Sequence, residues 1–513
     1  MKRFAQLYRE LDQSTATLDK RAALIRYFRE APPRDAAWAL YLLSGGKVAG
    51  ARKKIANTRE LREWIAIESG TPDWLVDDSY DQVGDLAETL ALLLDDPAEA
   101  APDVALADWI EIRLLPVANK DIELRRAVIV EAWRTLRFDE RLLFNKLLTG
   151  ALRVGVSQRL VQQALAELTG IDIARLAQRM LGAWTPTPDF LRDLLTVEEL
   201  PGDRQQPYPF FLASPLESAL RAEAGLPEAE PAGDEATDTA PDIVALANDP
   251  DAVARALGPV EDWLLEWKWD GIRVQAINDG GVRRLYSRTG EDISNSFPDL
   301  IEALNFDGTV DGELLVRRGE DVAVFGDLQK RLGRKLVGRG MLESHPAGLR
   351  VYDLMIWQGR DLRELPLMER RAVLESADFG SDRIDVSPLL DFTTWDDLAA
   401  LRADPPAAVI EGVMIKRRDS PYVGGRPRGP WFKWKRDPHV VDAVLLYAQR
   451  GHGKRSGFYS DFTFGLWEAD QLVPVGKAYF GFTDEELREL DRFVRNHTTE
   501  RFGPVRAVAP KLV

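Results

Sequence analysis

The chain contains no cysteine among its 513 residues. This absence excludes disulfide bonds, thiol catalysis and cysteine-based zinc sites, and it is typical of a protein from a reducing interior. No run of about eighteen apolar residues occurs, and the N-terminus lacks the apolar core of a signal peptide. The four histidines are scattered and form no metal-ligand pattern. We therefore expect a cytoplasmic protein that does not associate with a membrane.

Charge is distributed unevenly along the sequence. The net charge is −16, which by itself argues against a nucleic-acid partner. Residues 222–251, however, contain nine acidic and no basic residues, whereas residues 330–339 and 425–436 each contain five basic and no acidic residues. Such segregation is compatible with a polyanion bound in a basic groove of an otherwise acidic protein.

Residues 1–205 show the periodicity of helices. Apolar residues recur at Phe4, Leu7 and Leu11, a spacing that predicts an amphipathic helix. Ser157 is suited to cap the start of a later helix, which Gly170 would end. We expect an all-α domain over residues 1–205. It could grip phosphates through helix N-termini, or serve as a scaffold or protein-interaction module.

Residues 206–438 alternate between strands and short helices, which predicts an α+β domain with mainly antiparallel sheets. The acidic segment at about 222–251, rich in Ala, Pro and Gly, is interpreted as a loop. The predicted strands are 272–277, 282–287, 309–316, 322–325, 349–357, 409–416 and 431–435. The predicted helices are 298–304, 327–332 and 369–376.

Residues 439–513 contain strand-like runs separated by glycine-rich turns. The runs are 440–448, 462–468 and 472–480, and a helix is predicted at 484–496. A short strand-rich domain with one helix favours a small β-barrel of the OB-fold type, a common nucleic-acid platform. The predicted fold is therefore multidomain: an all-α domain, an α+β domain and an OB-fold β-barrel.

The eight residues from Glu266 to Arg273 are Glu-Trp-Lys-Trp-Asp-Gly-Ile-Arg. Lys268 lies between two tryptophans, and the break at Asp270-Gly271 presents it at a tight turn. Apolar neighbours would partly desolvate its ammonium and favour the neutral, nucleophilic amine. The alternative is an ordinary hairpin lysine whose tryptophan neighbours pack on a core.

Further charged and aromatic residues lie on or beside the predicted strands. Lys433 and Lys435 share one face because strand side chains alternate, and Asp311 is interpreted as shaping the turn before Glu313. The remaining members are Arg288, Glu313, Tyr352, Glu411 and Lys416. One lysine nucleophile, several carboxylates, cations and an aromatic residue suit attack on a phosphoanhydride, with Mg²⁺ held by the carboxylates.

In this order and at these separations, the clusters resemble the nucleotidyltransferase motifs of ATP-dependent DNA ligases. Residues 146–155, Lys-Leu-Leu-Thr-Gly-Ala-Leu-Arg-Val-Gly, resemble a signature of the helical DNA-binding domain carried by the larger of these ligases. The resemblance covers nearly the whole chain. It implies a helical DNA-binding domain (1–205), an adenylyltransferase domain (206–438) and an OB-fold domain (439–513).

The resemblance also implies a role for each matched residue. Lys268 is the lysine that becomes linked to AMP, and Tyr352 stacks on adenine. Glu266 binds the base, Glu313 contacts the ribose, and Glu313 and Glu411 are candidate metal ligands. The other implied nucleotide contacts are Arg273, Arg288, Lys416, Arg428, Lys433 and Lys435. The implied partner is nicked double-stranded DNA. The resemblance implies a monomeric enzyme that contacts the sugar-phosphate backbone of the DNA without sequence specificity.

One feature departs from the family pattern. The family carries a final basic motif of the Arg-x-Asp-Lys kind, whereas this sequence ends at residues 506–513, Arg-Ala-Val-Ala-Pro-Lys-Leu-Val. On that basis we expect an incomplete OB-fold domain, poor self-adenylylation and retained sealing of a pre-adenylylated nick. The remaining alternatives are an RNA ligase, an mRNA-capping guanylyltransferase and a non-catalytic DNA-binding scaffold.

Overall fold

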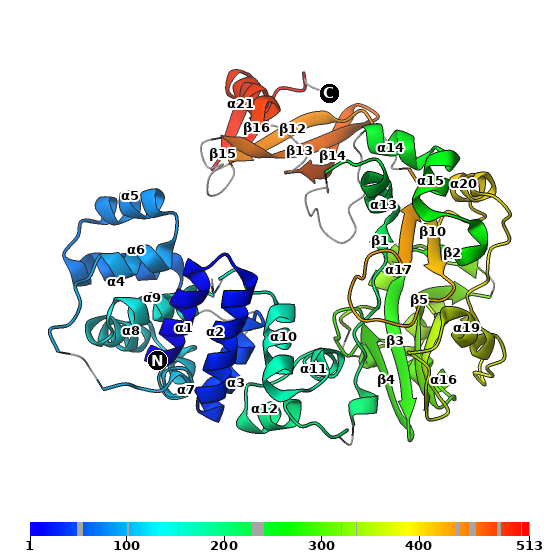
Figure 1. Ribbon diagram of the computed structural model, residues 1–513. Coiled ribbons are helices and arrows are strands. Elements are labelled where there is room, and N and C mark those ends of the chain that lie inside the picture. The colour runs from blue at the N-terminus through cyan, green and yellow to red at the C-terminus, as the bar shows by residue number, and fades with distance from the viewer. Residues whose placement is uncertain are drawn as a thin grey trace. The chain divides into compact units, whose positions relative to one another are not determined.

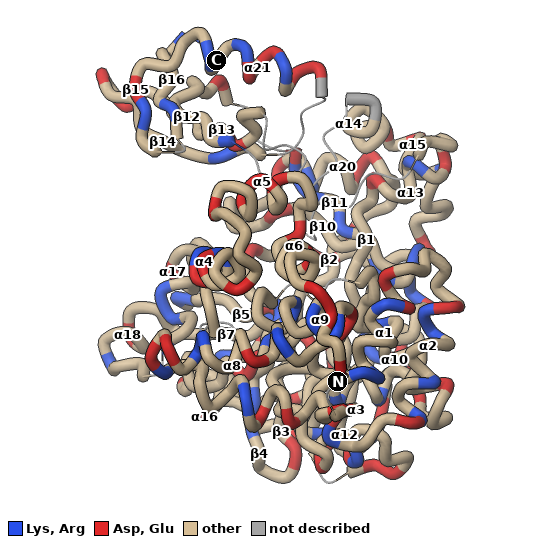
Figure 2. Tube along the Cα trace, turned by 90° about the vertical axis from the view of Figure 1, so that its left-hand side faces the viewer, with Lys and Arg blue, Asp and Glu red and all other residues tan. Residues whose placement is uncertain are grey.

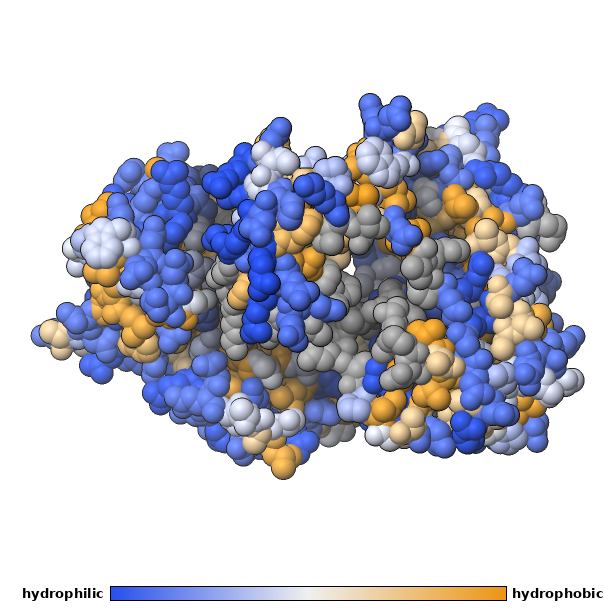
Figure 3. Space-filling view, turned by 90° about the horizontal axis from the view of Figure 1, so that it is seen from above, coloured by the Kyte–Doolittle hydropathy of each residue, from blue (hydrophilic) through white to orange (hydrophobic). Residues whose placement is uncertain are grey.

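The computed structural model forms two compact units, Met1–Arg436 and Asp437–Val513. The residues it describes are 1–48, 55–99, 102–150, 152, 154–200, 202–227, 241–319, 321–334, 336–437, 441–450, 458–479, 484–503 and 505–511. The predicted boundary at 438/439 and residues 228–240 of the predicted acidic loop lie outside them. No helix of the described chain is long and apolar enough to span a bilayer. The face seen in Figure 3 is mostly hydrophilic.

The first 200 residues are helical, as predicted (blue and cyan in Figure 1). Ser157 caps α10, because its hydroxyl oxygen accepts a hydrogen bond from the Leu160 amide at 3.2 Å, and Gly170 ends the helix in the left-handed conformation. The α-helices are α1 Lys2–Gln13, α2 Thr17–Glu30, α3 Pro33–Leu43, α4 Thr58–Ser69, α5 Asp73–Val83, α6 Leu86–Leu92, α7 Leu106–Asp108, α8 Ile122–Thr135, α9 Phe138–Thr149, α10 Gln158–Thr169, α11 Ile173–Arg179 and α12 Pro188–Leu194.

The remainder of the first unit contains two sheets, which are antiparallel except for the pairs β1–β11 and β7–β9. The four-stranded sheet has the order β1-β11-β10-β2, with β1 Ser214–Pro215, β2 Trp263–Trp269, β10 Ile410–Arg417 and β11 Trp431–Lys435. The seven-stranded sheet has the order β4-β3-β5-β7-β8, and β6 and β9 pair at its sides. Its strands are β3 Ile272–Asp279, β4 Val282–Ser287, β5 Gly308–Arg318, β6 Asp321–Val322, β7 Ala347–Trp357, β8 Arg360–Asp361 and β9 Ile384–Val386.

The turn at Asp270-Gly271 joins the two sheets, because β2 belongs to one and β3 to the other. A β-carbon at Gly271 would lie 2.6 Å from the carbonyl oxygen of Leu314 in β5. That distance is below van der Waals contact, so only glycine fits. The glycine thus allows the close approach of the neighbouring strand β5, and it also lines the pocket described below.

The segment predicted as a loop at 222–251 is partly helical, which corrects that prediction. Helix α14 is Pro241–Ala247 and α15 is Pro250–Leu257, after α13 Leu216–Glu223. Helices α14 and α15 each begin with a proline, at the first helical position, where the backbone amide hydrogen has no partner within the helix. Apolar side chains such as Val253 and Leu257 pack with α20 (Trp395–Ala403) against the four-stranded sheet. The local acidic composition concealed this buried face.

Four helices accompany the seven-stranded sheet. They are α16 Pro298–Ala303, α17 Phe325–Gln329, α18 Arg339–Ser344 and α19 Leu367–Glu375. The predicted strand 322–325 is wrong, since β6 pairs with β5 only at Asp321 and Val322 and α17 begins at Phe325. A short apolar run such as this one fits either a strand or a helix, and only hydrogen bonding to a neighbouring strand distinguishes the two.

The second unit is a five-stranded antiparallel sheet with one helix. The sheet order is β14-β13-β12-β16-β15, and α21 packs Leu487 and Val494 against Leu445 and Phe462. Acidic and basic residues alternate along α21 (Figure 2). The elements are β12 Val444–Arg450, β13 Tyr459–Glu468, β14 Gln471–Ala478, α21 Asp484–His497, β15 Thr498–Phe502 and β16 Val505–Val508. The sequence did not predict β15 and β16.

Candidate active site

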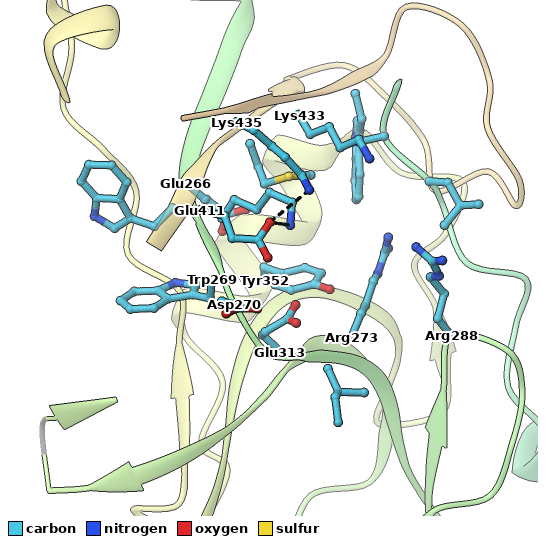
Figure 4. A pocket seen from close by; sticks show the side chains of 18 of the residues that line it. Glu266, Trp269, Asp270, Arg273, Arg288, Glu313, Tyr352, Glu411, Lys433 and Lys435 are labelled. Carbon is cyan, nitrogen blue, oxygen red and sulfur yellow. Dashed lines mark hydrogen bonds and ion pairs between the residues drawn. The ribbon is translucent and has the colours of Figure 1, made fainter. Parts of the chain in front are cut away.

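A pocket of about 520 Å³ lies in the first unit, where the ends of β2, β3, β10 and β11 meet (Figure 4). Ten of the residues singled out in the sequence line it: Glu266, Lys268, Arg273, Arg288, Glu313, Tyr352, Glu411, Lys416, Lys433 and Lys435. Arg428 is not among the lining residues, whereas Arg426 is. The two arginines stand two positions apart in an irregular segment, where sequence spacing cannot decide which one faces a cavity.

Lys268 is ion-paired in the pocket. Its Nζ donates to Glu411 Oε2 at 2.6 Å, and Lys435 Nζ lies 3.5 Å from the same oxygen (Figure 4). Strand pairing creates this contact, since Lys268 stands opposite Gly412 in the β2–β10 ladder. Trp267 packs in a core cluster, Trp269 lines the pocket, and the Lys268 side chain is 18% exposed. The predicted desolvation of the ammonium stays a prediction.

Two carboxyl groups beside Lys268 have opposite pKa shifts. Burial would raise the pKa of Glu411, but the Lys268 and Lys435 ammonium groups outweigh it and hold that pKa below its usual range. Burial and the charge of Glu411 raise the pKa of Asp270, which shares a hydrogen bond with Glu411. The sequence reading assigned Asp270 only to the turn. Its position two residues after Lys268 was the available signal, because alternate strand residues share a face.

Glu313 lies on β5, directly opposite Arg273 of β3. Burial raises the pKa of Glu313 to about 8, although the nearby charges of Lys268 and Arg273 act to lower it. At neutral pH the side chain therefore carries a proton. A cation entering the pocket would favour loss of that proton.

Arg273 is held by Asp311 in a bidentate ion pair. Its Nε and Nη2 donate to the two Asp311 oxygens at 3.0 and 2.7 Å, and Nη1 donates to the carbonyl of Phe211. The Tyr422 hydroxyl donates to Asp311 at 2.6 Å. Asp311 is fully buried within β5, so its interpretation as a turn residue is wrong. It fixes the guanidinium at the edge of the pocket.

Tyr352, Glu266 and Lys416 line the pocket and lie close to one another. The Lys416 ammonium lies 4.5 Å from the centre of the Tyr352 ring and 4.7 Å from that of Trp431. It also donates to Glu266 Oε2, while Arg371 of α19 donates to Oε1 at 2.9 Å. The sequence reading missed Arg371. An arginine four residues after Leu367, on the buried face of the helix, was the signal that could have revealed it.

Cations from β11 and from the segment after β4 border the pocket. Arg288 follows β4, and the neighbouring Ser287 and Thr289 hydroxyls are hydrogen-bonded at 3.0 Å. Lys433 and Lys435 both line the cavity from β11, as strand alternation predicts. The pocket thus combines one lysine held by a carboxylate, an aromatic face and several cations. This set suits a phosphorylated purine.

Known proteins match both parts of the first unit. A family model described as "ATP dependent DNA ligase domain" matches residues 245–435, and one described as "DNA ligase N terminus" matches residues 1–166. A "Probable DNA ligase" of Koribacter versatilis is 30% identical over 100% of this chain and 88% of its own length. The "DNA ligase" of Thermococcus fumicolans is 25% identical over 99% and 89%, respectively.

The fold also matches along most of the chain. The solved structure named Pmar-Lig_Pre aligns with a TM-score of 0.55 over 96% of this chain and 91% of its own, at 14% identity. This likeness concerns the fold alone. The full-length 30% identity, the two family models and the pocket around Lys268 agree with one another. The chain belongs to the ATP-dependent DNA ligases.

Proposed function

We propose that the enzyme seals nicks in duplex DNA through an AMP group carried on Lys268. The Lys268 nitrogen attacks the α-phosphorus of ATP, forming an N–P bond while the bond to the bridging oxygen breaks and pyrophosphate leaves. AMP then passes to the 5′-phosphate of the nick, and the 3′-hydroxyl displaces it to close the strand. The observation that carries the proposal is the position of Lys268 in the pocket, 2.6 Å from Glu411.

The ion pair supplies the orientation and the proton acceptor that this chemistry needs. Lys268 must lose a proton before it can attack, and Glu411 is within hydrogen-bonding distance of its nitrogen. Holding the nucleophile in one direction also lowers the entropic cost of reaching the transition state. Two ammonium groups face the Glu411 carboxylate and hold its pKa low, so it is ionised and accepts a hydrogen bond from Lys268.

The other lining residues are proposed to bind the nucleotide. Tyr352 stacks on adenine, Glu266 accepts a hydrogen bond from the base, and Glu313 contacts the ribose. The cations proposed to contact the phosphates and sugar are Arg273, Arg288, Lys416, Lys433 and Lys435. We assign to Arg426 the contact that the family pattern assigns to Arg428, because Arg426 lines the pocket.

Glu313 and Glu411 are the proposed ligands of Mg²⁺. Magnesium prefers oxygen ligands and is usually held by one or two carboxylates together with substrate phosphates. Asp270, Glu313 and Glu411 provide such oxygens around the pocket, and no group of three or more acidic or histidine side chains in the described residues could hold a metal by itself. The residues therefore fit an ion that binds together with ATP. Bound there, it would neutralise charge on the phosphate oxygens.

For the whole chain we propose three functional parts and a monomeric, cytoplasmic enzyme. Residues 1–205 bind DNA, 206–438 carry out nucleotidyl transfer, and 439–513 form an OB-fold domain. The antiparallel sheet with a single packed helix supports the last assignment. DNA is contacted through its backbone, because a nick is defined by its ends and not by its sequence.

The test is incubation with ATP or GTP labelled at the α-phosphate, with Mg²⁺, followed by detection of covalent label on denatured protein. Label from ATP that is absent in Lys268→Ala, followed by sealing of nicked duplex DNA, is expected. Label from GTP instead would favour a capping-type guanylyltransferase. Label transfer to nicked RNA but not to DNA would favour an RNA ligase. Absence of label together with failure to seal a pre-adenylylated nick would favour a DNA-binding scaffold.

A further inference from the structure

Glu266 is a buried carboxylate with two cationic partners. The residue is 3% exposed on β2, with Arg371 at one oxygen and Lys416 at the other. A buried carboxylate is stable only when its charge is compensated and its oxygens are hydrogen-bonded. Both partners come from distant parts of the chain: Arg371 is 105 residues away and Lys416 is 150 residues away.

The two partners differ in how firmly they are held. Arg371 uses all three guanidinium nitrogens: Nη1 to Glu266, Nη2 to the Ser387 carbonyl at 2.6 Å and Nε to Glu375 at 2.8 Å. These contacts fix the planar group in one orientation within α19. Lys416 ends in a single ammonium on a flexible stem.

The Lys416 ammonium also occupies the face of Tyr352. It lies 4.5 Å from the ring centre, between that ring and Trp431. A purine stacked on Tyr352 would need this space, since stacked rings lie about 4.5 Å or more apart between centroids. Entry of the base therefore requires Lys416 to leave, and its departure also removes one of the two counter-charges of Glu266. Arg371 is the partner that stays.

We propose that Arg371 is a positioning residue that holds Glu266 for the adenine 6-amino group and so makes the pocket select 6-aminopurines over 6-oxopurines. The inference rests on the proposed function, in which Glu266 contacts the base. With Arg371 at one oxygen, the oxygen released by Lys416 accepts a hydrogen bond from the 6-amino group. A 6-oxo group would instead place its own acceptor oxygen against the Glu266 carboxylate oxygen, so no hydrogen bond can form. Because Arg371 fixes the carboxylate, Glu266 cannot rotate to relieve this repulsion.

The experiment measures kcat/KM for covalent charging of the full chain with three nucleotides. ATP carries a 6-amino group, purine riboside triphosphate has only hydrogen at that position, and inosine triphosphate has a 6-oxo group. Arg371→Met removes both the positive charge and the guanidinium hydrogen-bond donors. Arg371→Lys retains the charge but not the guanidinium geometry. Glu369→Gln changes an exposed acid of the same helix that does not line the pocket, and it serves as the matched control.

The wild-type enzyme is expected to prefer ATP over both analogues. In Arg371→Met, kcat/KM for ATP should fall by about tenfold or more, the usual effect of losing a hydrogen bond to a charged group. The value for purine riboside triphosphate should change little, because that base makes no such bond. Arg371→Lys should recover part of the ATP preference, and Glu369→Gln should leave it unchanged.

Two results would overturn the inference. An equal loss with ATP and purine riboside triphosphate in both Arg371 variants would mean that the arginine supports only the fold. An unchanged ATP preference in both variants would mean that Glu266 is held without it. Charging of the wild type with ATP but without preference over purine riboside triphosphate would instead refute the proposed contact between Glu266 and the base, and the role of Arg371 with it. Absence of any charging, together with failure to seal a pre-adenylylated nick, would refute the proposed function itself.

Discussion

The Nζ of Lys268 lies 2.6 Å from Oε2 of Glu411, although 143 residues separate them in the chain. The β2–β10 ladder brings them together, and Lys435 approaches the same carboxylate from β11. The nucleophile proposed for this ligase is thus ion-paired with an acid that comes from another strand.

Replacing Glu411 should therefore slow self-adenylylation strongly. Glu411→Gln keeps the shape but removes the charge and the proton acceptor, and we expect the charging rate to fall by about a hundredfold or more. Rapid-quench measurement of label on the protein gives the rate. Glu375→Gln, a carboxylate outside the pocket, is the control. A rate within about twofold of the wild type would show that Glu411 has no part in the step.

The raised pKa of Glu313 predicts how stability depends on pH. Its pKa is about 8 in the folded protein and 4.5 in the reference state, so the folded state binds this proton more tightly. Its contribution to stability is therefore present at low pH and is lost as the pH rises through that interval, by about 1.4 kcal/mol for each pH unit. Thermal unfolding of wild type and Glu313→Gln across this range measures the effect.

The glutamine side chain of Glu313→Gln is uncharged at every pH, so this variant should not lose stability through this group as the pH rises. The difference in unfolding midpoint between the variant and the wild type should therefore widen in favour of the variant as the pH approaches 8. Parallel curves for the two proteins would contradict the pKa of Glu313. Binding of Mg²⁺ and ATP near neutral pH should also release about one proton more from the wild type, which titration calorimetry in two buffers detects.

Gly271 should not tolerate a side chain. In Gly271→Ala the new β-carbon would lie 2.6 Å from the Leu314 carbonyl oxygen, so β3 or β5 must shift. A loss of about 1–3 kcal/mol in stability is expected, together with slower charging because the turn positions Lys268. Gly326→Ala is the matched control, since no atom lies within 4 Å of its added carbon. Equal unfolding midpoints for the two variants would exclude the steric explanation.

Binding of nicked DNA should weaken steeply with salt and be insensitive to sequence. Contacts to phosphates release counterions, so the logarithm of the affinity should fall linearly with the logarithm of salt concentration. Fluorescence anisotropy with two nicked duplexes of unrelated sequence measures both properties. A shallow salt dependence, or affinities that differ about tenfold between the duplexes, would contradict backbone recognition.

The sequence predicted those elements whose pattern is local. Strands β3, β4 and β11 were found because their side chains alternate, and α10 because Ser157 and Gly170 mark its ends. Helices α14 and α15 were missed because an acidic composition hid their buried faces. Strand β15 is largely exposed and β16 is only 4 residues long, so each carries little apolar signal.

The sequence predicted several of the residues that line the pocket, but not which of them form ion pairs and hydrogen bonds with one another. Motif spacing indicated ten of its lining residues. The Arg371–Glu266 and Arg273–Asp311 pairs depend on which strands and helices lie together, and such long-range geometry is absent from local sequence. The same limit explains why the sequence did not indicate Arg426 as a lining residue and why the raised pKa values of Asp270 and Glu313 were not foreseen.

The most direct test of the central claim is to locate the nucleotide on the protein. The full chain is incubated with ATP and Mg²⁺, digested and analysed by tandem mass spectrometry. We predict a single AMP group, on the peptide that contains Lys268, and none in Lys268→Arg. AMP on any other residue, or undiminished AMP on the Lys268→Arg protein, would contradict the account.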